Sequence, residues 1–124
     1  MSTSAGRAFA AAIAAKDADA VTALLAPELD FKALTPKKFW EATEPGGVLD
    51  TVFGFWFTET DRIDELLAVE EGEPIEDTAQ VSYRFAITND EGLHTVEQTA
   101  YYRTEGDRIS YLRVLCSGYR PVAG

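Results

Sequence analysis

The chain is poor in the residues on which several kinds of site depend. Its 124 residues include one cysteine, Cys116, and one histidine, His94. No intramolecular disulfide can form, and any Ser-His or Cys-His scheme must use His94. Basic residues are also scarce, since 11 Lys and Arg stand against 21 Asp and Glu and give a formal net charge of −10. Nucleic acids and anionic membranes are bound by clustered Lys and Arg, so neither is expected as a partner.

Long hydrophobic runs are also missing. The longest apolar segments, residues 8–15 and 52–57, are too short to cross a bilayer. A single cysteine fits a reducing compartment, so we expect a cytoplasmic protein. The chain is 46% hydrophobic and 26% charged, as in ordinary soluble proteins. At this length, residues 1–124 are expected to form one domain with its own core.

The first half of the chain carries helical spacing. Residues 4–15 predict a helix capped by Ser4, and a second helix follows from a cap at Asp17 until Pro27 ends it. Residues 29–34 are a short strand candidate. Residues 35–47 predict a third helix that begins at Thr35 and Pro36 and is broken by Pro45 and the glycines after it. The apolar spacing of residues 49–56 predicts a fourth.

The second half of the chain changes to a period of two. We expect strands over 63–71, 79–87, 93–104 and 108–119, with the last three joined as hairpins by "TNDEGL" and "TEGD". Helices followed by a run of long strands indicate an α+β fold, in which helices cover one face of an antiparallel sheet.

The register of the last hairpin decides which residues face the helices. A three-residue "TEG" turn pairs Gln98 with Leu112 and Val96 with Val114, and then an uncharged row points inward. A turn longer by one residue would invert one strand and bring Glu97 inward in place of Gln98. The uncharged row is the favoured interpretation, and it predicts an apolar, aromatic interior with few polar groups.

With these predicted elements, the chain resembles the NTF2-like superfamily, and within it the SnoaL-like proteins of polyketide cyclase and ketosteroid isomerase type. The resemblance rests on "AAKDADAVTALLAPELDF", on "GFWF" and on "YYRTEGDRISYLRVLCSGY". It implies a cystatin-like cone of helices on a curved antiparallel sheet, a hydrophobic small molecule in the cone, and a homodimer. No metal or other cofactor is expected.

The resemblance does not bring the isomerase's chemistry with it. The positions that match the family's base, its donor tyrosine and its protonated aspartate are Ala33, Phe9 and Thr99. None of the three can act as that reaction requires, since it needs a base and two proton donors. Asp30 lies three residues from the base position, so we expect it to face solvent.

The remaining polar groups of the predicted interior are the candidate catalytic residues. They are His94, Gln98 and Tyr102, with Glu97 as the alternative base. Cys116 is expected to act as a small apolar side chain rather than a reactive thiolate. The predicted ligand-binding residues are Phe9, Ile13, Trp40, Phe53, Trp56, Tyr83, Phe85, Leu112, Val114 and Cys116.

The sequence therefore favours a protein that binds a small, mostly apolar ligand. If the protein is an enzyme, we expect a cyclase, isomerase or hydratase that works without a cofactor. The alternative is an interaction or dimerisation module that works through the outer face of its sheet. That face is predicted to carry residues of mixed charge and an aromatic ring: Arg84, Glu97, Arg103, Tyr111 and Arg113.

Overall fold

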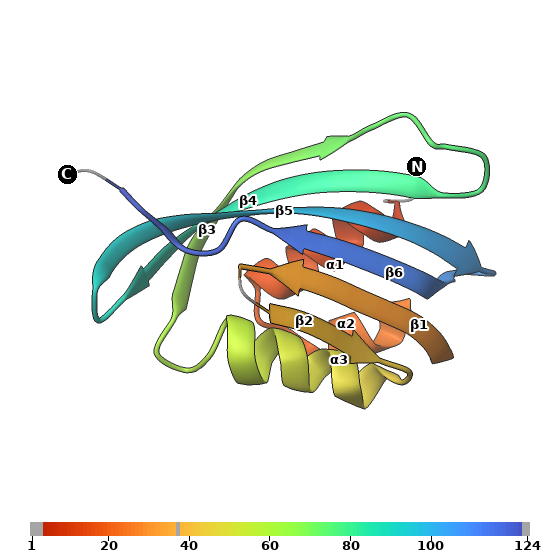
Figure 1. Ribbon diagram of the computed structural model, residues 1–124, viewed down its shortest axis with the longest axis horizontal. Coiled ribbons are helices and arrows are strands. Elements are labelled where there is room, and N and C mark those ends of the chain that lie inside the picture. The colour runs from red at the N-terminus through yellow and green to blue at the C-terminus, as the bar shows by residue number, and fades with distance from the viewer. Residues whose placement is uncertain (1–3, 37, 123–124) are drawn as a thin grey trace.

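The computed structural model describes residues 4–36 and 38–122, in which helices cover one face of a curved sheet (Figure 1). In chain order the elements are α1 (Ala5–Ala14), α2 (Ala18–Leu24), β1 (Leu25–Thr35), β2 (Lys38–Ala42), α3 (Pro45–Thr51), the π-helical turn η1 (Val52–Trp56), β3 (Arg62–Glu71), β4 (Ala79–Asn89), β5 (Gly92–Glu105), β6 (Arg108–Cys116) and β7 (Arg120–Pro121). None of the described helices has the length and apolar character needed to cross a membrane.

The first two helices begin as their capping residues predict. The Ser4 hydroxyl accepts the Arg7 N–H at 3.2 Å, and the Asp17 carboxylate accepts the Ala20 N–H at 3.0 Å. The prediction that Pro27 ends the second helix is wrong. Helix α2 ends at Leu24, and Pro27 lies inside β1, which begins at Leu25.

The predicted third helix is also wrong, because residues 38–42 form β2 instead. This strand pairs antiparallel with β1, with Leu34 opposite Phe39 and Thr35 opposite Lys38. The Trp40 indole N–H donates to the Thr35 hydroxyl at 2.8 Å and ties the hairpin together. A proline just after a strand fits a tight turn as well as a first helical position, and pairing with β1 decides between them. Residue 37 lies outside the described residues.

Helix α3 begins at Pro45, where a helix break was predicted. Proline suits the first turn of a helix because the N–H it lacks would have no intrahelical partner there. The predicted fourth helix is confirmed as α3 and η1 together, and Val48, Val52 and Trp56 form its buried side.

The sheet has the strand order β2-β1-β6-β5-β4-β3, and β7 pairs with β5. The sheet is mixed rather than antiparallel throughout, because β1 runs parallel to β6. The other long neighbours are antiparallel. Helix α1 packs against β3 and β4, whereas α3 packs against β1 and β2. The helices therefore lie on one side of the sheet and leave its outer face uncovered (Figure 1).

The β5–β6 register differs from the prediction, but the inward row is the predicted one. Gln98 lies opposite Cys116 instead of Leu112, and Val114 lies opposite Ala100 instead of Val96. The turn is shorter than expected, since Glu105 pairs with Arg108. That change alone would turn Arg113 inward. An irregularity between the Arg103 and Thr104 pairs adds one residue to β6, which restores the uncharged row to the inner face.

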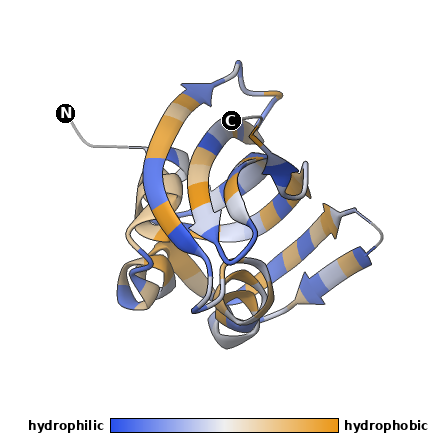
Figure 2. Cartoon of the chain, turned by 90° about the vertical axis from the view of Figure 1, so that its left-hand side faces the viewer, coloured by the Kyte–Doolittle hydropathy of each residue, from blue (hydrophilic) through white to orange (hydrophobic). Residues whose placement is uncertain are grey.

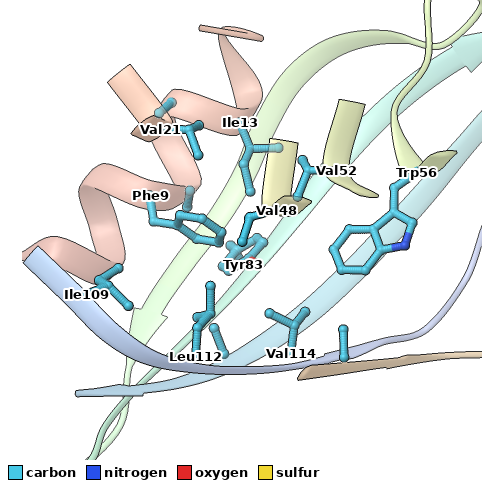
Figure 3. Packing of buried hydrophobic residues seen from close by; sticks show 14 of the residues in the cluster. Phe9, Ile13, Val21, Val48, Val52, Trp56, Tyr83, Ile109, Leu112 and Val114 are labelled. Atoms are coloured by element: carbon cyan, nitrogen blue, oxygen red, sulfur yellow. The ribbon is translucent and has the colours of Figure 1, made fainter. Parts of the chain in front are cut away.

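The core lies between this inner row and the helices. Phe9 and Ile13 from α1 meet Tyr83 and Leu112 from the sheet, all at 1% exposure or less (Figure 3). The Phe9 and Tyr83 rings pack edge to face, 6.5 Å apart. Figure 2 shows the alternation along the strands as bands of hydrophilic and hydrophobic colour. The middle of the space between helices and sheet is thus filled with side chains.

Candidate functional site

The candidate ligand-binding site lies at one end of the core, beside Trp56. An apolar chamber of about 200 Å³ opens there, and its walls include Trp40, Phe55, Trp56, Phe57, Cys116 and Tyr119. The rings come from β2, η1 and the segment after β6. Trp40 packs on Phe55 at 5.2 Å and edge-on against Trp56 at 6.2 Å. Aromatic walls around a small apolar space suit a ligand with a flat or compact apolar body.

A polar chamber of about 370 Å³ adjoins the apolar one, and the two share Phe55, Trp56 and Tyr119 in their walls. We call the two chambers together the mouth cleft. The polar walls come from the turn before β3 and from the β4–β5 hairpin, and they include Thr58, Thr60, Asp61, Asn89, Asp90, Glu91 and His94. Aromatic rings thus surround one chamber and titratable groups line the other.

Asp61 is the buried acid of the mouth cleft, at 8% exposure. Burial raises the pKa of its carboxyl. Hydrogen bonds from the Asn89 amide and from the Thr58 N–H and hydroxyl outweigh that effect, so the pKa lies below its usual value. The carboxylate is thus ionised at neutral pH, and it is held in place by the turn that it closes.

Tyr119 joins the two chambers. Its hydroxyl donates to the Trp56 carbonyl oxygen at 2.6 Å, and its ring packs against Phe57. Burial and the neighbouring Asp61 carboxylate raise the pKa of the Tyr119 hydroxyl, so it stays protonated at neutral pH. This residue therefore works as a donor and a wall rather than as a base.

His94 is buried in the wall of the polar chamber, at 5% exposure. Its Nδ1 lies 3.0 Å from the Gly92 carbonyl oxygen, and its ring packs edge-on against Tyr119 at 5.8 Å. A carbonyl can only accept, so Nδ1 carries the proton of this bond, and in the neutral ring Nε2 holds the free lone pair. The geometry gives the mouth cleft one nitrogen base.

Gln98 lies on the inner face of β5, between Val96 and Ala100 and opposite Cys116. It is 1% exposed and accepts the Tyr83 hydroxyl at 2.8 Å, whereas its Nε2 has no partner. Val96 and Cys116 line the apolar chamber, so the amide lies just behind that wall. Burial raises the pKa of the Tyr83 hydroxyl, which keeps it a donor.

The other two predicted catalytic residues do not join His94. Tyr102 lies eight residues further along β5, about 26 Å away at the usual strand rise, where its ring packs close to Gly6 of α1. Glu97 points to the outer face, where it pairs with Arg84 at 2.6 Å. The alternative in which Glu97 replaces Gln98 on the inner face is thereby wrong.

Asp30 is exposed, as predicted, and pairs with Arg113 and Lys32 on the outer face. Hydrogen bonds from Arg113 and Lys32 hold the pKa of its carboxyl below the usual value. Phe9 and Ala33 are buried among apolar side chains, and the Thr99 hydroxyl bonds Ser82 at 3.0 Å. These are the positions that match the isomerase's three functional groups, and none of them holds an ionisable side chain.

The predicted ligand-binding residues divide between the mouth cleft and the packed core. Trp40, Trp56 and Cys116 line the apolar chamber. The others pack in or against the core cluster: Phe9, Ile13, Phe53, Tyr83, Phe85, Leu112 and Val114. Within the described residues, His, Cys, Asp and Glu form no group of three that could hold a metal ion.

Sequence reasoning missed Asp61, Tyr119 and Phe55. By its position before a predicted strand, Asp61 is a turn residue, and it does accept the Thr58 N–H. Its place in the cleft depends on the β4–β5 hairpin folding back beside that turn, and no local spacing indicates this. Tyr119 was expected at the end of the last strand, but β6 ends at Cys116, so strand alternation does not place its side chain.

Three helices and a π-helical turn on one face of a curved, mixed sheet define the NTF2-like cone fold. Solved structures confirm it: a candidate isomerase from Bacillus subtilis matches with a TM-score of 0.74 at 16% identity, over 91% of this chain and 84% of that one. A candidate polyketide cyclase from Pseudomonas putida KT2440 matches with a TM-score of 0.66 at 14% identity, over 91% of each chain.

A third structure is a protein with a ketosteroid isomerase-like fold from Catenulispora acidiphila DSM 44928, in complex with trimethylamine. It matches with a TM-score of 0.65 at 13% identity, over 94% of this chain and 88% of that one. No protein-family model matches the chain, and no curated protein matches its sequence. At these identities the likeness shows the fold alone.

Proposed function

We propose that this protein binds a small, largely apolar molecule in the mouth cleft. The observation that carries the proposal is the junction of an aromatic-walled apolar chamber with a polar chamber that holds a buried, ionised Asp61 and the only histidine. The packed core beneath serves as a rigid floor. A fold neighbour in complex with trimethylamine supports the use of this fold for small ligands.

The enzymatic activity that we propose for the cleft is that of a cyclase, isomerase or hydratase that works without a cofactor. Such reactions move a proton to or from carbon or oxygen, and His94 is the cleft's candidate for that role. Asp61 has its pKa lowered, so it stabilises positive charge instead of taking up a proton. Tyr102 and Glu97 take no part in this reaction, because neither side chain reaches the cleft.

Native mass spectrometry of freshly purified protein, compared with the denatured sample, tests the proposal. We expect an excess mass that disappears on denaturation. Both tryptophans line the apolar chamber, so their fluorescence reports its occupancy in the same sample. Cys116→Phe, which fills the chamber, should abolish the excess mass, whereas Leu67→Phe on exposed β3 should retain it. A clean apo mass with no tryptophan response to apolar probes contradicts the proposal.

A second function is favoured by the outer face of the sheet. Phe39, Leu34 and Leu115 lie opposite one another across β2, β1 and β6, and each is about half exposed. A row of exposed apolar side chains among ion pairs suits a symmetric contact with a second copy. Sedimentation at two concentrations tests this: a dimer that Leu115→Ser dissociates supports the contact, and a monomer at both concentrations contradicts it.

A further inference from the structure

The polar chamber carries negative charge. Asp61, Asp90 and Glu91 are among its described lining residues, which include no Lys or Arg. The Lys16 ammonium donates to the Thr58 and Asp61 carbonyl oxygens. Because those contacts go to backbone oxygens, Lys16 does not neutralise a carboxylate of the chamber.

The rings beside these carboxylates suit a cation. Phe55, Trp56 and Tyr119 are walls of both chambers, and the faces of such rings attract ammonium groups. The walls already attract one cation, since the Lys38 ammonium lies 4.1 Å from the Trp40 ring centre and 5.6 Å from that of Phe55. Carboxylates next to aromatic faces form the pair of features that recognises an organic ammonium ion.

A second observation is independent of the acidic cluster. Trp56 is 7% exposed, and its Nε1 is buried with no hydrogen-bond partner. In Figure 3 that edge of the ring points away from Val52 and Tyr83, and Trp56 is a wall of the apolar chamber. An unpaired buried donor is costly, and an acceptor atom on a ligand body in that chamber would satisfy it.

We propose that the ligand of the mouth cleft is an organic amine cation. Its ammonium group lies between Asp61 and the aromatic rings, its apolar body fills the apolar chamber, and an oxygen on that body accepts from Trp56 Nε1. This inference rests on the proposed function, because it assigns the chemical class of the molecule that the cleft binds.

Binding measurements with probes that share one body test the inference. The first three are 3-phenoxypropylamine, 3-phenoxypropanol and 3-phenoxypropanoate, which differ only in a cationic, neutral or anionic end group. The amine should bind roughly tenfold more tightly than the alcohol, and the carboxylate more weakly than either. The fourth probe, 4-phenylbutylamine, replaces the ether oxygen by a methylene, so it should bind several-fold more weakly than 3-phenoxypropylamine.

Variants of the acidic residues show which of them cause the preference for the amine over the alcohol. Asp61→Asn should remove most of the amine-over-alcohol ratio, and the control Asp50→Asn, an equal charge change on exposed α3, should leave it unchanged. Asp61→Asn also disturbs the turn that Asp61 closes. The double variant Asp90→Asn/Glu91→Gln removes negative charge from the same chamber at two exposed positions, so it tests the electrostatic effect without that disturbance. A ratio that survives both cleft variants overturns the inference.

The outcomes also separate the inference from the proposed function. Equal binding of amine and alcohol overturns the amine class, whereas the small-molecule function stands. Failure of all four probes to bind, together with a clean apo mass of the purified protein, overturns both.

Discussion

Among single residues, Gln98 and Tyr83 form the most deeply buried polar pair that the structure describes on the inner face of the sheet. The Tyr83 hydroxyl donates to Gln98 Oε1 at 2.8 Å, and Gln98 Nε2 has no partner. A buried donor without an acceptor weakens the fold, whereas a pair of apolar side chains of similar shape does not. The unpaired Gln98 amide therefore costs stability. An apolar residue at position 98 would recover that stability only if Tyr83 were also replaced by an apolar residue.

Gln98→Leu should destabilise the protein by about 1–3 kcal/mol, because it leaves the Tyr83 hydroxyl buried without an acceptor. Adding Tyr83→Phe should return most of that loss, and the double variant should approach wild-type stability. Urea unfolding of all four proteins gives the coupling energy directly. Additive losses would mean that the two side chains do not interact as the structure places them.

At the scale of elements, the turn after β6 shapes the mouth cleft. Gly118 has φ +78° and lines the apolar chamber, and a Cβ built on it would lie 2.7 Å from Pro36 Cγ of the β1–β2 turn. A left-handed backbone and a close neighbour both select glycine at this position. The turn holds Tyr119 in the cleft by the same geometry.

Gly118→Ala should therefore lower the free energy of unfolding by about 1–2 kcal/mol and disturb the cleft. Gly46→Ala is the matched control: it lies in α3 with open space around it, so it should stabilise the protein by about 0.5–1 kcal/mol. Thermal unfolding of the two variants compares them. A neutral Gly118→Ala would show that the turn can adopt another conformation.

The same elements show how far sequence patterns reach. Alternation predicted β4 and the inward row of β5 because burial on one face leaves a local signature. The pattern of residues 38–42 gave no such signature, since β2 is short and partly exposed, and its identity as a strand depends on pairing with β1. The mouth cleft depends on contacts between distant segments, so His94 was predicted as a candidate whereas Asp61 was not.

At the scale of the whole molecule, the net charge of −10 gives acid pH a large effect. In the part of the chain that the structure describes, four carboxyl groups have pKa values held below the usual range by hydrogen bonds or ion pairs: Asp30, Asp61, Asp64 and Glu71. Of these, Asp61 is the buried one. A lowered folded-state pKa means that the folded protein binds fewer protons than the unfolded chain, so protonation favours unfolding.

The stability contributed by Asp61 should thus be present above its ordinary pKa of 3.8 and be lost as the pH falls through the lower folded-state value. Asp61→Asn should cost about 1–3 kcal/mol at pH 7, because its hydrogen bonds to a charged acceptor are weakened. Its stability should then fall less steeply between roughly pH 5 and 2 than that of the wild type or of Asp50→Asn. Urea unfolding across this range measures the three slopes. Parallel curves for Asp61→Asn and Asp50→Asn would show that the acid limb arises from surface charge, and that the Asp61 carboxylate is not held in the cleft by Thr58 and Asn89.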